Sequence, residues 1–503
     1  MEQQILSFPV LVAFLLFVLM VFKIRKKSII TNAPGPWRLP FIGNIHQLAG
    51  GQPHHRLTDL AKTYGPVMSL QLGQVPAVVI SSAETAKLVL KTHELQFIER
   101  PSLLAADIML YNRTDIIFAP YGDYWRQMKK IAILELLSSK RVQSFKSVRE
   151  EEVSNFIKFI YSKAGSPINL SRTLLSLTNS IIAKTSIGKK FKRQEQIIEL
   201  ITDAIAAAGG FSVVDLFPSY KLLHVISGMN SKLRRIHREV DEILEEIIDE
   251  HKANKAAASE IEAENILDVL LDMQGLEFPL TNDNIKAIIL EMFGAASDTS
   301  SVTTEWALSE MMKNPLVMKR AQVEVRDIFS DKGDVDEAKL HELKYLKLVI
   351  KETLRLHPPL ALIPRECCER TKLNGYDIYP KSRVLINAWA IGRDPNSWTD
   401  PERFYPERFL NSSVDMKGTN FELIPFGAGK RMCPGISMAM ANIELSLAQL
   451  LYHFKWKLPG EAQQQDLDMG EAFGLAVKRK LDLNLIPTPF RPLPVKRMTM
   501  EKI

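Results

Sequence analysis

The chain has 503 residues, of which 46% are hydrophobic and 24% are charged, a composition typical of a folded globular protein. Its formal net charge of +6 comes from the two ends, because segments 2–27 and 491–502 each carry four basic residues and one acidic residue. The remainder is close to neutral, which excludes the broad basic surface of a nucleic-acid-binding protein. The three cysteines, Cys367, Cys368 and Cys433, form no CxxC pattern, which argues against a disulfide framework or a structural zinc site.

The N-terminus carries an uncharged apolar run from Ile5 to Phe22. As a helix, these roughly 18 residues reach about 27 Å, close to the hydrocarbon thickness of a bilayer. Basic residues follow the run at positions 23–27, the reverse of a cleaved signal peptide, and the positive-inside rule places everything after them in the cytosol. We therefore predict a membrane anchor with its basic flank over residues 1–30 and one globular unit over residues 31–503. A buried core helix is the alternative interpretation of the run.

The globular unit is predicted to be mostly α-helical with a small β part. Residues Val67–Ser81 alternate in polarity and break at Gly73, which indicates a β-hairpin. Residues Thr281–Lys313 predict an unusually long helix that ends before Pro315. A last apolar helix is expected over Ile436–Phe454.

The middle of the long predicted helix has an unusual composition. Residues Ile285–Ala296 are apolar nearly all round, so this part of the helix must be buried. The polar run Ser297–Ser301, which includes Asp298 and Thr299, follows at once. Buried polar groups are unfavourable unless they have partners or a function, so this run is a candidate site.

The strongest local pattern is the decapeptide from Phe426 to Gly435, which contains three glycines and Cys433. Pro434 suits the first position of the helix that follows, which would place Cys433 at its N-cap. Unpaired backbone N–H groups and the helix dipole there would favour a thiolate over a thiol. Such a cysteine is either a metal ligand or a nucleophile.

This decapeptide resembles the signature F-x-x-G-x-R-x-C-x-G of the cytochrome P450 family, with Phe426, Gly429, Arg431, Cys433 and Gly435 at the fixed positions. The resemblance implies the cytochrome P450 fold, with haem b held between the long central helix and the cysteine loop. It also implies that the Cys433 thiolate is the axial ligand of the haem iron and that Arg431 pairs with a haem propionate.

Two further segments resemble the family and imply structural roles. Glu352-Thr353-Leu354-Arg355 matches its E-x-x-R motif, and Phe404–Phe409 matches its PERF segment. The resemblance implies a buried charged triad of Glu352, Arg355 and Arg408, an arrangement that tolerates burial only when most hydrogen bonds are satisfied.

Three more residues are implied to bind the haem. Trp125 and Lys129 resemble the helix residues that contact the propionates, although a lysine stands where an arginine is more usual. Arg365, which follows Pro364, resembles the strand arginine that binds the other propionate; a surface arginine is the alternative.

The segment from Ala295 to Ser300 resembles the family's oxygen-activation motif, except that Ala296 replaces the customary glycine. By resemblance, Asp298 and Thr299 are the catalytic pair that relays protons toward bound dioxygen. The alternative for Thr299 is a hydroxyl that donates to a carbonyl of its own helix.

Phrases such as Tyr121–Arg126 and Lys347–Pro359 resemble plant microsomal cytochromes P450, and more narrowly oxidases of sesquiterpenes and of macrocyclic diterpenes such as casbene. The resemblance implies a lipophilic pocket of low charge, which favours a hydrocarbon substrate. The substrate-binding residues it implies are Ala295, Leu360, Ala361, Ile363, Phe473 and Leu475.

The expected activity is therefore a monooxygenase on the endoplasmic reticulum membrane, with its catalytic domain over residues 31–503 facing the cytosol and no nucleic-acid partner. It would use O2 and electrons from NADPH-cytochrome P450 reductase to oxidise a lipophilic terpenoid. A basic surface would dock the reductase; its expected members are Lys129, Lys130, Lys140, Arg141 and Lys430. The alternatives are a cytochrome P450 that isomerises or dehydrates, an oxidase of a phenolic or other plant metabolite, and a non-enzymatic membrane haem protein.

Overall fold

The computed structural model describes residues 33–492, except for 208–210, 258–264, 276–278, 332 and 462. The apolar run Ile5–Phe22 and its basic flank lie outside the described residues. Within the described part of the chain, no helix combines the length and the apolar character that crossing a bilayer requires.

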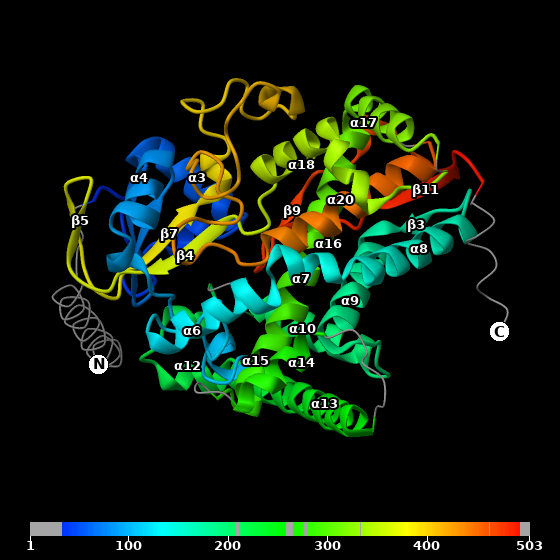
Figure 1. Cartoon of the computed structure of the whole chain (residues 1–503). Coiled ribbons are helices and arrows are strands. Elements are labelled where there is room, and N and C mark those ends of the chain that lie inside the picture. The colour runs from blue at the N-terminus through cyan, green and yellow to red at the C-terminus, as the bar shows by residue number, and fades with distance from the viewer. Residues whose placement is uncertain are drawn as a thin grey trace, which may run out of the picture.

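Helices dominate the described chain, as predicted, and Figure 1 shows α16 running through the helical side with α20 next to it. The long helices are α3 (Pro53–Tyr64), α8 (Lys146–Ser162), α9 (Leu170–Ile187), α10 (Gln194–Ala207), α13 (Met229–Ala257), α15 (Asn282–Glu291), α16 (Ser297–Lys313), α17 (Pro315–Ile328), α18 (Lys344–Leu356) and α20 (Ile436–His453). Shorter helices include α2 (Ile45–Leu48), α4 (Ala83–Lys87), α5 (Leu104–Met109), α6 (Asp123–Ile131), α7 (Ser139–Ser144), α11 (Val213–Leu216), α12 (Lys221–Ile226), α14 (Ile266–Asp272) and α19 (Ala388–Ile391).

A four-stranded sheet forms the other side of the molecule (Figure 1), in the order β1 (Val67–Leu72), β2 (Val75–Ile80), β7 (Arg383–Asn387), β4 (Leu362–Glu366). The predicted hairpin is confirmed: β1 and β2 pair antiparallel from Val67 opposite Ile80 to Leu72 opposite Val75. Gly73 turns the chain with a φ of 60°, a conformation that favours glycine. Strand β2 then pairs parallel with β7, which brings residues near 80 and 385 together.

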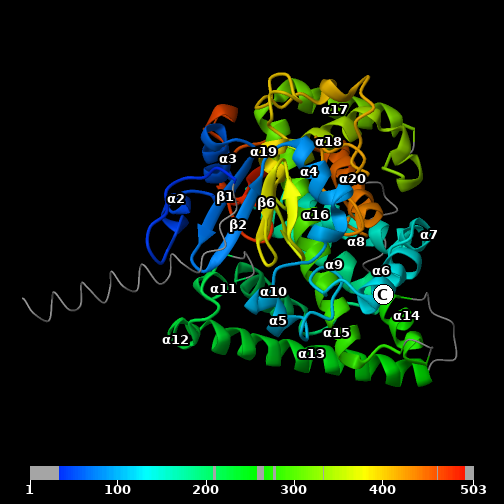
Figure 2. The same ribbon diagram turned by 90° about the vertical axis from the view of Figure 1, so that its left-hand side faces the viewer.

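Smaller strands complete the fold. Strand β9 (Glu471–Ala472) pairs antiparallel with β10 (Lys478–Arg479). Strand β11 (Asn484–Pro489) pairs with β3 (Ile168–Asn169) and β8 (Phe454–Lys457), and β5 (Thr371–Leu373) pairs with β6 (Tyr376–Ile378). Figure 2 shows α13 along one edge of the molecule, with α11 and α12 at one of its ends below the β1–β2 hairpin.

The predicted long helix is present, but it has a wider turn at its centre. Thr281 caps α15, a π-helical segment covers Met292–Ala296, and α16 continues to Lys313. Such π-helical turns inside α-helices are often found at functional sites. The wider turn falls directly before Asp298 and Thr299, so it adjusts how these two residues are presented.

The largest apolar core lies where α8, α9, α16, α17, α18 and α20 meet. Trp306 of α16 is fully buried beside this core, and its ring stacks on His357 with a centroid distance of 4.0 Å. Helix α16, which carries Asp298 and Thr299, packs against α18 and α20, and the cysteine loop directly precedes α20.

Candidate active site

The cysteine loop is held by its own backbone. The Cys433 N–H donates to the Phe426 carbonyl at 3.0 Å, which closes the loop across its ends. Gly429 has a φ of 71°, and a Cβ there would lie 2.2 Å from the Leu90 carbonyl oxygen. Only glycine fits this close approach, so the loop lies tightly against the segment that follows α4.

One expectation for Cys433, its place at the N-cap, is wrong. Gly435, not Cys433, is the N-cap residue, and α20 begins at Ile436. The Gly435 N–H donates to the Cys433 sulfur at 3.4 Å. Although Cys433 keeps accessible surface, protein crowds its thiol, and this desolvation raises the pKa of Cys433 against the Gly435 hydrogen bond and the charge of Lys129. Desolvation opposes this single long N–H···S bond, whereas a metal bound to the sulfur would hold it as a thiolate.

The predicted basic residues gather beside this loop. Arg431 donates to the carbonyls of Ile98 at 3.1 Å and Ala119 at 2.7 Å, and its guanidinium lies 4.3 Å from the centre of the Trp125 ring. Lys129 donates to the Met432 carbonyl. Arg365 is buried on β4 and donates to the Pro364 carbonyl at 3.0 Å.

Arg100 completes this cluster, although no motif pointed to it. Its guanidinium donates to the carbonyls of Ile117 at 3.2 Å and Pro364 at 2.5 Å. Burial, together with the charges of Arg365 and Arg431, holds the pKa of Arg100 well below its usual range. The partners that fix Arg100 lie 17 and 264 residues away, so spacing in the sequence could not reveal its role.

The cluster has an excess of positive charge. Burial lowers the pKa of Arg365 to about 9 and that of Arg431 to about 10. Burial also lowers the pKa of Lys129 to about 8. The Nη1 atom of Arg431 is buried without a hydrogen-bond partner among the described residues. A buried group of cations fits an anionic cofactor, and a haem with two propionates meets this demand.

Two buried carboxyl groups hold the loop of residues 115–119, which lies beside the cation cluster. Glu291 on α15 accepts from the Ile116 N–H at 2.7 Å, and Asp115 accepts from the N–H groups of Ile117 and Phe118 at 3.0 and 2.8 Å. Trp125 donates to the Ile116 carbonyl at 2.9 Å. The loop that receives Arg100 and Arg431 is therefore attached to the central helix.

Asp298 on α16 is buried and has one ionic partner, Lys478 on β10, whose Nζ lies 2.5 Å from Oδ1. Burial raises the pKa of Asp298, and Lys478 opposes this shift. The Lys478 side chain is 36% exposed, so it connects the buried carboxyl to the surface. No pattern in the sequence indicates a role for Lys478, since its partner lies 180 residues away.

Thr299 follows the alternative considered for it: its hydroxyl donates to the Ala295 carbonyl at 2.7 Å. Ala295 belongs to the π-helical segment. The hydroxyl oxygen retains its lone pairs, because the hydroxyl acts here only as a donor.

An apolar cavity lies between the sheet, the β9–β10 hairpin and the loops before α5. Of the six predicted substrate-binding residues, Leu360, Ala361, Phe473 and Leu475 line it, but Ala295 and Ile363 do not. Ile363 packs into the core of the sheet instead, while its neighbours Leu362 and Pro364 face the cavity. The other lining residues are Pro101, Leu103, Phe118, Phe211, Arg383, Leu385 and Gly474.

The three residues of the expected triad lie together. Arg355 donates to both oxygens of Glu352 at 2.8 Å from Nε and Nη2, and Arg408 donates to Glu352 at 3.0 Å. Arg355 and Glu352 are fully buried. Arg355 also donates to the carbonyls of Gly392 and Pro401, so this unit joins α18 to the segment before the cysteine loop.

Comparison with known proteins identifies the family of the chain. The family model Cytochrome P450 matches residues 33–483. The chain is 59% identical to Cytochrome P450 726A27 of Euphorbia lathyris over 497 residues, covering 97% of this chain and 99% of that protein. It is 51% identical to premnaspirodiene oxygenase of Hyoscyamus muticus over 499 residues, covering 97% and 99%.

A solved structure of a zebrafish cytochrome P450 with abiraterone shares the fold. It matches 88% of this chain and 99% of its own chain, with a TM-score of 0.73 at 24% identity. The chain therefore belongs to the cytochrome P450 family of haem-thiolate monooxygenases.

Proposed function

We propose that this enzyme oxidises a lipophilic terpenoid with dioxygen, using electrons that NADPH-cytochrome P450 reductase delivers. The observation that carries the proposal is the cluster of buried cations beside Cys433, together with an apolar cavity whose predicted residues Leu360, Ala361, Phe473 and Leu475 come from two distant segments. The cations suit an anionic cofactor, and the cavity suits a hydrocarbon.

Cys433 would bind the haem iron through its sulfur, while Arg100, Arg365, Arg431, Lys129 and Trp125 would hold the propionates. Haem bound in this way supplies the chemistry that activates dioxygen, and the thiolate donates electron density that favours O–O cleavage. Phe426 and Gly435 would support the loop, since Phe426 packs against the main core and Gly435 donates to the sulfur. The triad of Glu352, Arg355 and Arg408 would stabilise the fold around it.

Asp298 and Thr299 would deliver protons to the site of oxygen activation. Asp298 is paired with the half-exposed Lys478 at 2.5 Å, which gives a proton a short path from the surface to the buried carboxyl. Thr299 donates to a helix carbonyl, so its oxygen can accept a further hydrogen bond from water or a ligand. A carboxyl group and a hydroxyl group in these adjacent positions favour a monooxygenase over a cytochrome P450 that only isomerises or dehydrates.

The terpenoid class is supported by the cavity and by the relatives. Phe118, Phe211 and Phe473 give the cavity aromatic walls, and the premnaspirodiene oxygenase that is 51% identical over nearly its whole length is named for a terpenoid. The methyl group of Ala296, where the family usually has glycine, would affect how closely the substrate approaches the central helix.

The reductase would dock on the side of the cysteine loop. Lys130, Lys140 and Lys430 are exposed, and they come from α6, α7 and the cysteine loop. Lys129 does not belong to this surface, because it is partly buried and donates to the Met432 carbonyl.

The catalytic domain over residues 31–503 would rest on the cytosolic face of the endoplasmic reticulum membrane, held by the anchor over residues 1–30. A group of exposed apolar side chains supports this orientation: Trp37, Val213, Leu222, Val225 and Ile226 are 52–76% exposed. The β1–β2 turn joins their two segments, since Gly73 donates to the Ile42 carbonyl and Gln74 donates to the Leu216 carbonyl. Exposed apolar side chains on two segments that the same turn connects favour contact with lipid.

The test is to express the full chain in microsomes with a plant reductase and NADPH under isotopically labelled dioxygen. The substrates are casbene, premnaspirodiene and related terpene olefins. We expect a product that carries one labelled oxygen atom, depends on NADPH and is absent with Cys433→Ala. A product that forms without NADPH or label would contradict the monooxygenase, and no product from any olefin would contradict the terpenoid class.

A further inference from the structure

Polar residues at the start of α3 bind β9, the strand that leads into the cavity. Gln52, the N-cap of α3, accepts from the Phe473 N–H at 2.8 Å through its Oε1 and donates to the Glu471 carbonyl at 2.7 Å through its Nε2. These two bonds hold β9 and the residue after it against the start of α3. They join residues about 420 positions apart in the chain.

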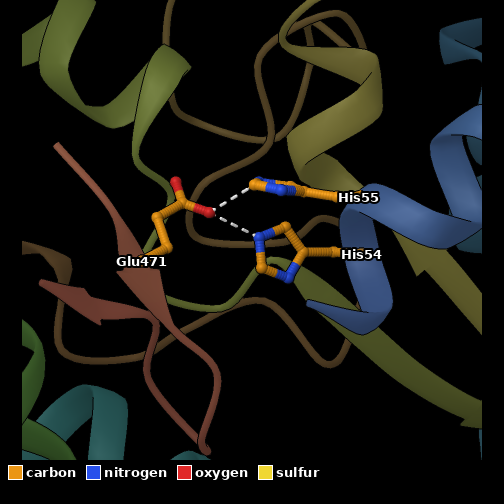
Figure 3. A group of neighbouring side chains, drawn as sticks. All are labelled: His54, His55 and Glu471. Atoms are coloured by element: carbon orange, nitrogen blue, oxygen red, sulfur yellow. Dashed lines mark hydrogen bonds and ion pairs between the residues drawn. The ribbon is translucent and has the colours of Figure 1, made fainter. Parts of the chain in front are cut away.

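The Glu471 side chain is the centre of this contact. Its Oε2 lies 2.6 Å from His54 Nε2 and 2.8 Å from His55 Nε2, as Figure 3 shows. Its Oε1 accepts from Trp389 Nε1 at 3.2 Å and lies 3.7 Å from His357 Nδ1. Both His54 and Glu471 are buried. Hydrogen bonds to a buried carboxylate are among the stronger polar contacts in proteins.

The α3 side of this contact is itself fixed. Asn387, the last residue of β7, donates to the His54 carbonyl at 2.9 Å and to the Thr58 hydroxyl at 3.1 Å. The start of α3 is therefore tied to the central sheet. Glu471 is held against a rigid support rather than against a surface loop.

The segment that follows Glu471 forms part of the cavity wall. Phe473, Gly474 and Leu475 all line the cavity, and the Phe473 ring stacks against His54 with a centroid distance of 5.7 Å. The hairpin then returns to Lys478, which pairs with Asp298. One end of the hairpin is thus fixed by α3 and the other by the central helix.

We propose that His54, His55 and Glu471 form a clamp that fixes the 473–475 segment in the cavity and thereby determines which carbon of the substrate is oxidised. These are positioning residues, since they act through Phe473 and Leu475. The proposal rests on the proposed function only in assuming that the cavity receives the substrate. A wall segment shifted by a fraction of an ångström changes which substrate atom faces the reacting centre.

Two variants of the full-length enzyme test the clamp, with a matched control. Glu471→Gln removes the charge that both histidines contact, and His55→Gln removes only the half-exposed partner. The control is His251→Gln, which breaks a similar histidine–carboxylate pair, His251–Asp268 at 2.8 Å, on α13 and α14. A normal spectrum of the reduced, carbon-monoxide-bound enzyme verifies that each variant holds haem.

The first readout is hydrogen exchange of residues 470–480, which reports local opening. The second is the affinity of a bulky azole, clotrimazole, relative to that of imidazole, which is too small to sense the cavity walls. The third is the product ratio from the terpene olefin that the wild type oxidises. We expect Glu471→Gln to speed exchange and to change the azole selectivity and the product ratio by about tenfold. His55→Gln should have smaller effects in the same direction, and His251→Gln should have none.

Unchanged exchange in Glu471→Gln would overturn the clamp. Faster exchange with unchanged azole selectivity and product ratio would overturn its role in specificity. The three side chains also offer a donor set for Zn²⁺. The clamp would be overturned in favour of a metal site if the purified enzyme held one equivalent of zinc and if removal of this zinc by a chelator changed the product ratio. If the wild type oxidises no terpenoid, the proposed function fails, while exchange and azole selectivity still decide whether the clamp exists.

Discussion

The cysteine loop and the substrate cavity contrast in how the chain builds them. The loop takes its shape from ten consecutive residues, Phe426 to Gly435, closed by the bond from the Cys433 N–H to the Phe426 carbonyl. The cavity takes its walls from separate segments between Pro101 and Leu475. This short-range bond sets the shape of the loop, and contacts of Gly429, Arg431 and Met432 with distant segments hold the loop in place. The cavity depends on distant anchors such as Glu471 and Lys478, so small changes outside it can alter its shape.

This contrast separates what the enzyme shares with its family from what distinguishes it. The thiolate, the buried cations and the triad form a rigid unit around the expected haem site. The cavity has one wall on strands β4 and β7 of the sheet and the others on a hairpin and on loops, and sequence changes are tolerated best in the loops. Substitutions should therefore change the substrate specificity of the enzyme more readily than they change its haem chemistry.

The largest expected effect comes from breaking the rigid unit. Arg355→Met leaves the buried Glu352 carboxylate without its bidentate partner, and loss of one member of a buried ion pair costs about 3–5 kcal/mol of folding free energy. Thermal unfolding monitored by circular dichroism should show a much lower midpoint. Lys62→Met is the matched control, because Asp59–Lys62 has the same i, i+3 spacing but is exposed and should contribute at most about 1 kcal/mol. Equal shifts in the two variants would contradict the rigid unit.

Next in size is the effect of Asp298→Asn. Without an ionisable carboxyl, proton delivery should fail, and product formation should fall by about a hundredfold. NADPH consumption should fall less than product formation. A larger share of the electrons from NADPH should then appear in hydrogen peroxide. The measurement is product and peroxide formed per NADPH. A variant with full product yield per NADPH would exclude Asp298 from the proton path.

A smaller effect is expected from Arg100→Met, which removes one cation from the propionate-binding cluster. Loss of a charge-assisted hydrogen bond should weaken haem retention by about tenfold, measured as haem transfer to an excess of a haem-scavenging apoprotein. Arg383→Met is the control, since this buried arginine on β7 faces Asp215 and Glu366 instead. If both variants lose haem at the wild-type rate, Arg100 does not hold the cofactor.

The smallest effect is a shift in pH dependence with Lys478→Met. Burial raises the pKa of Asp298 and Lys478 lowers it, so without the lysine the carboxyl stays protonated up to a higher pH. In the pH profile of product formed per NADPH, the acidic limb should then move to higher pH. Lys478→Arg should restore the wild-type profile. An unshifted limb in Lys478→Met would show that the ion pair has no part in proton delivery.

The sequence predicted the contiguous parts of the site better than the assembled parts. The β1–β2 hairpin, the long central helix, the final helix and the contacts within the triad agree with the structure, because each depends on short-range patterns or on a family motif. The N-cap of the final helix is Gly435, two residues after the predicted Cys433, since Pro434 suits several positions of a first turn. Burial also raises the pKa of the Cys433 thiol, and the desolvation of a side chain cannot be read from its sequence neighbours.

The assembled parts were predicted incompletely for a related reason. Alternation along β4 turns Leu362 and Pro364 toward the cavity and Ile363 into the core of the sheet, so Ile363 does not line this cavity. Strand alternation could have revealed this, had the orientation of the strand been known. Arg100 and Lys478 offered no such signal, since their partners lie across the fold. Pairs of this kind appear only when the tertiary structure places them together.

The central claim is that Cys433 binds haem as a thiolate beside the cation cluster. The most direct test is the absorption spectrum of the reduced, carbon-monoxide-bound protein for the wild type, Cys433→Ser and Cys368→Ser. Cys368 is the control, because its thiol is exposed and lies outside the loop. We predict the characteristic haem-thiolate spectrum for the wild type and Cys368→Ser and its complete loss for Cys433→Ser. A haem-thiolate spectrum that persists in Cys433→Ser would contradict the account.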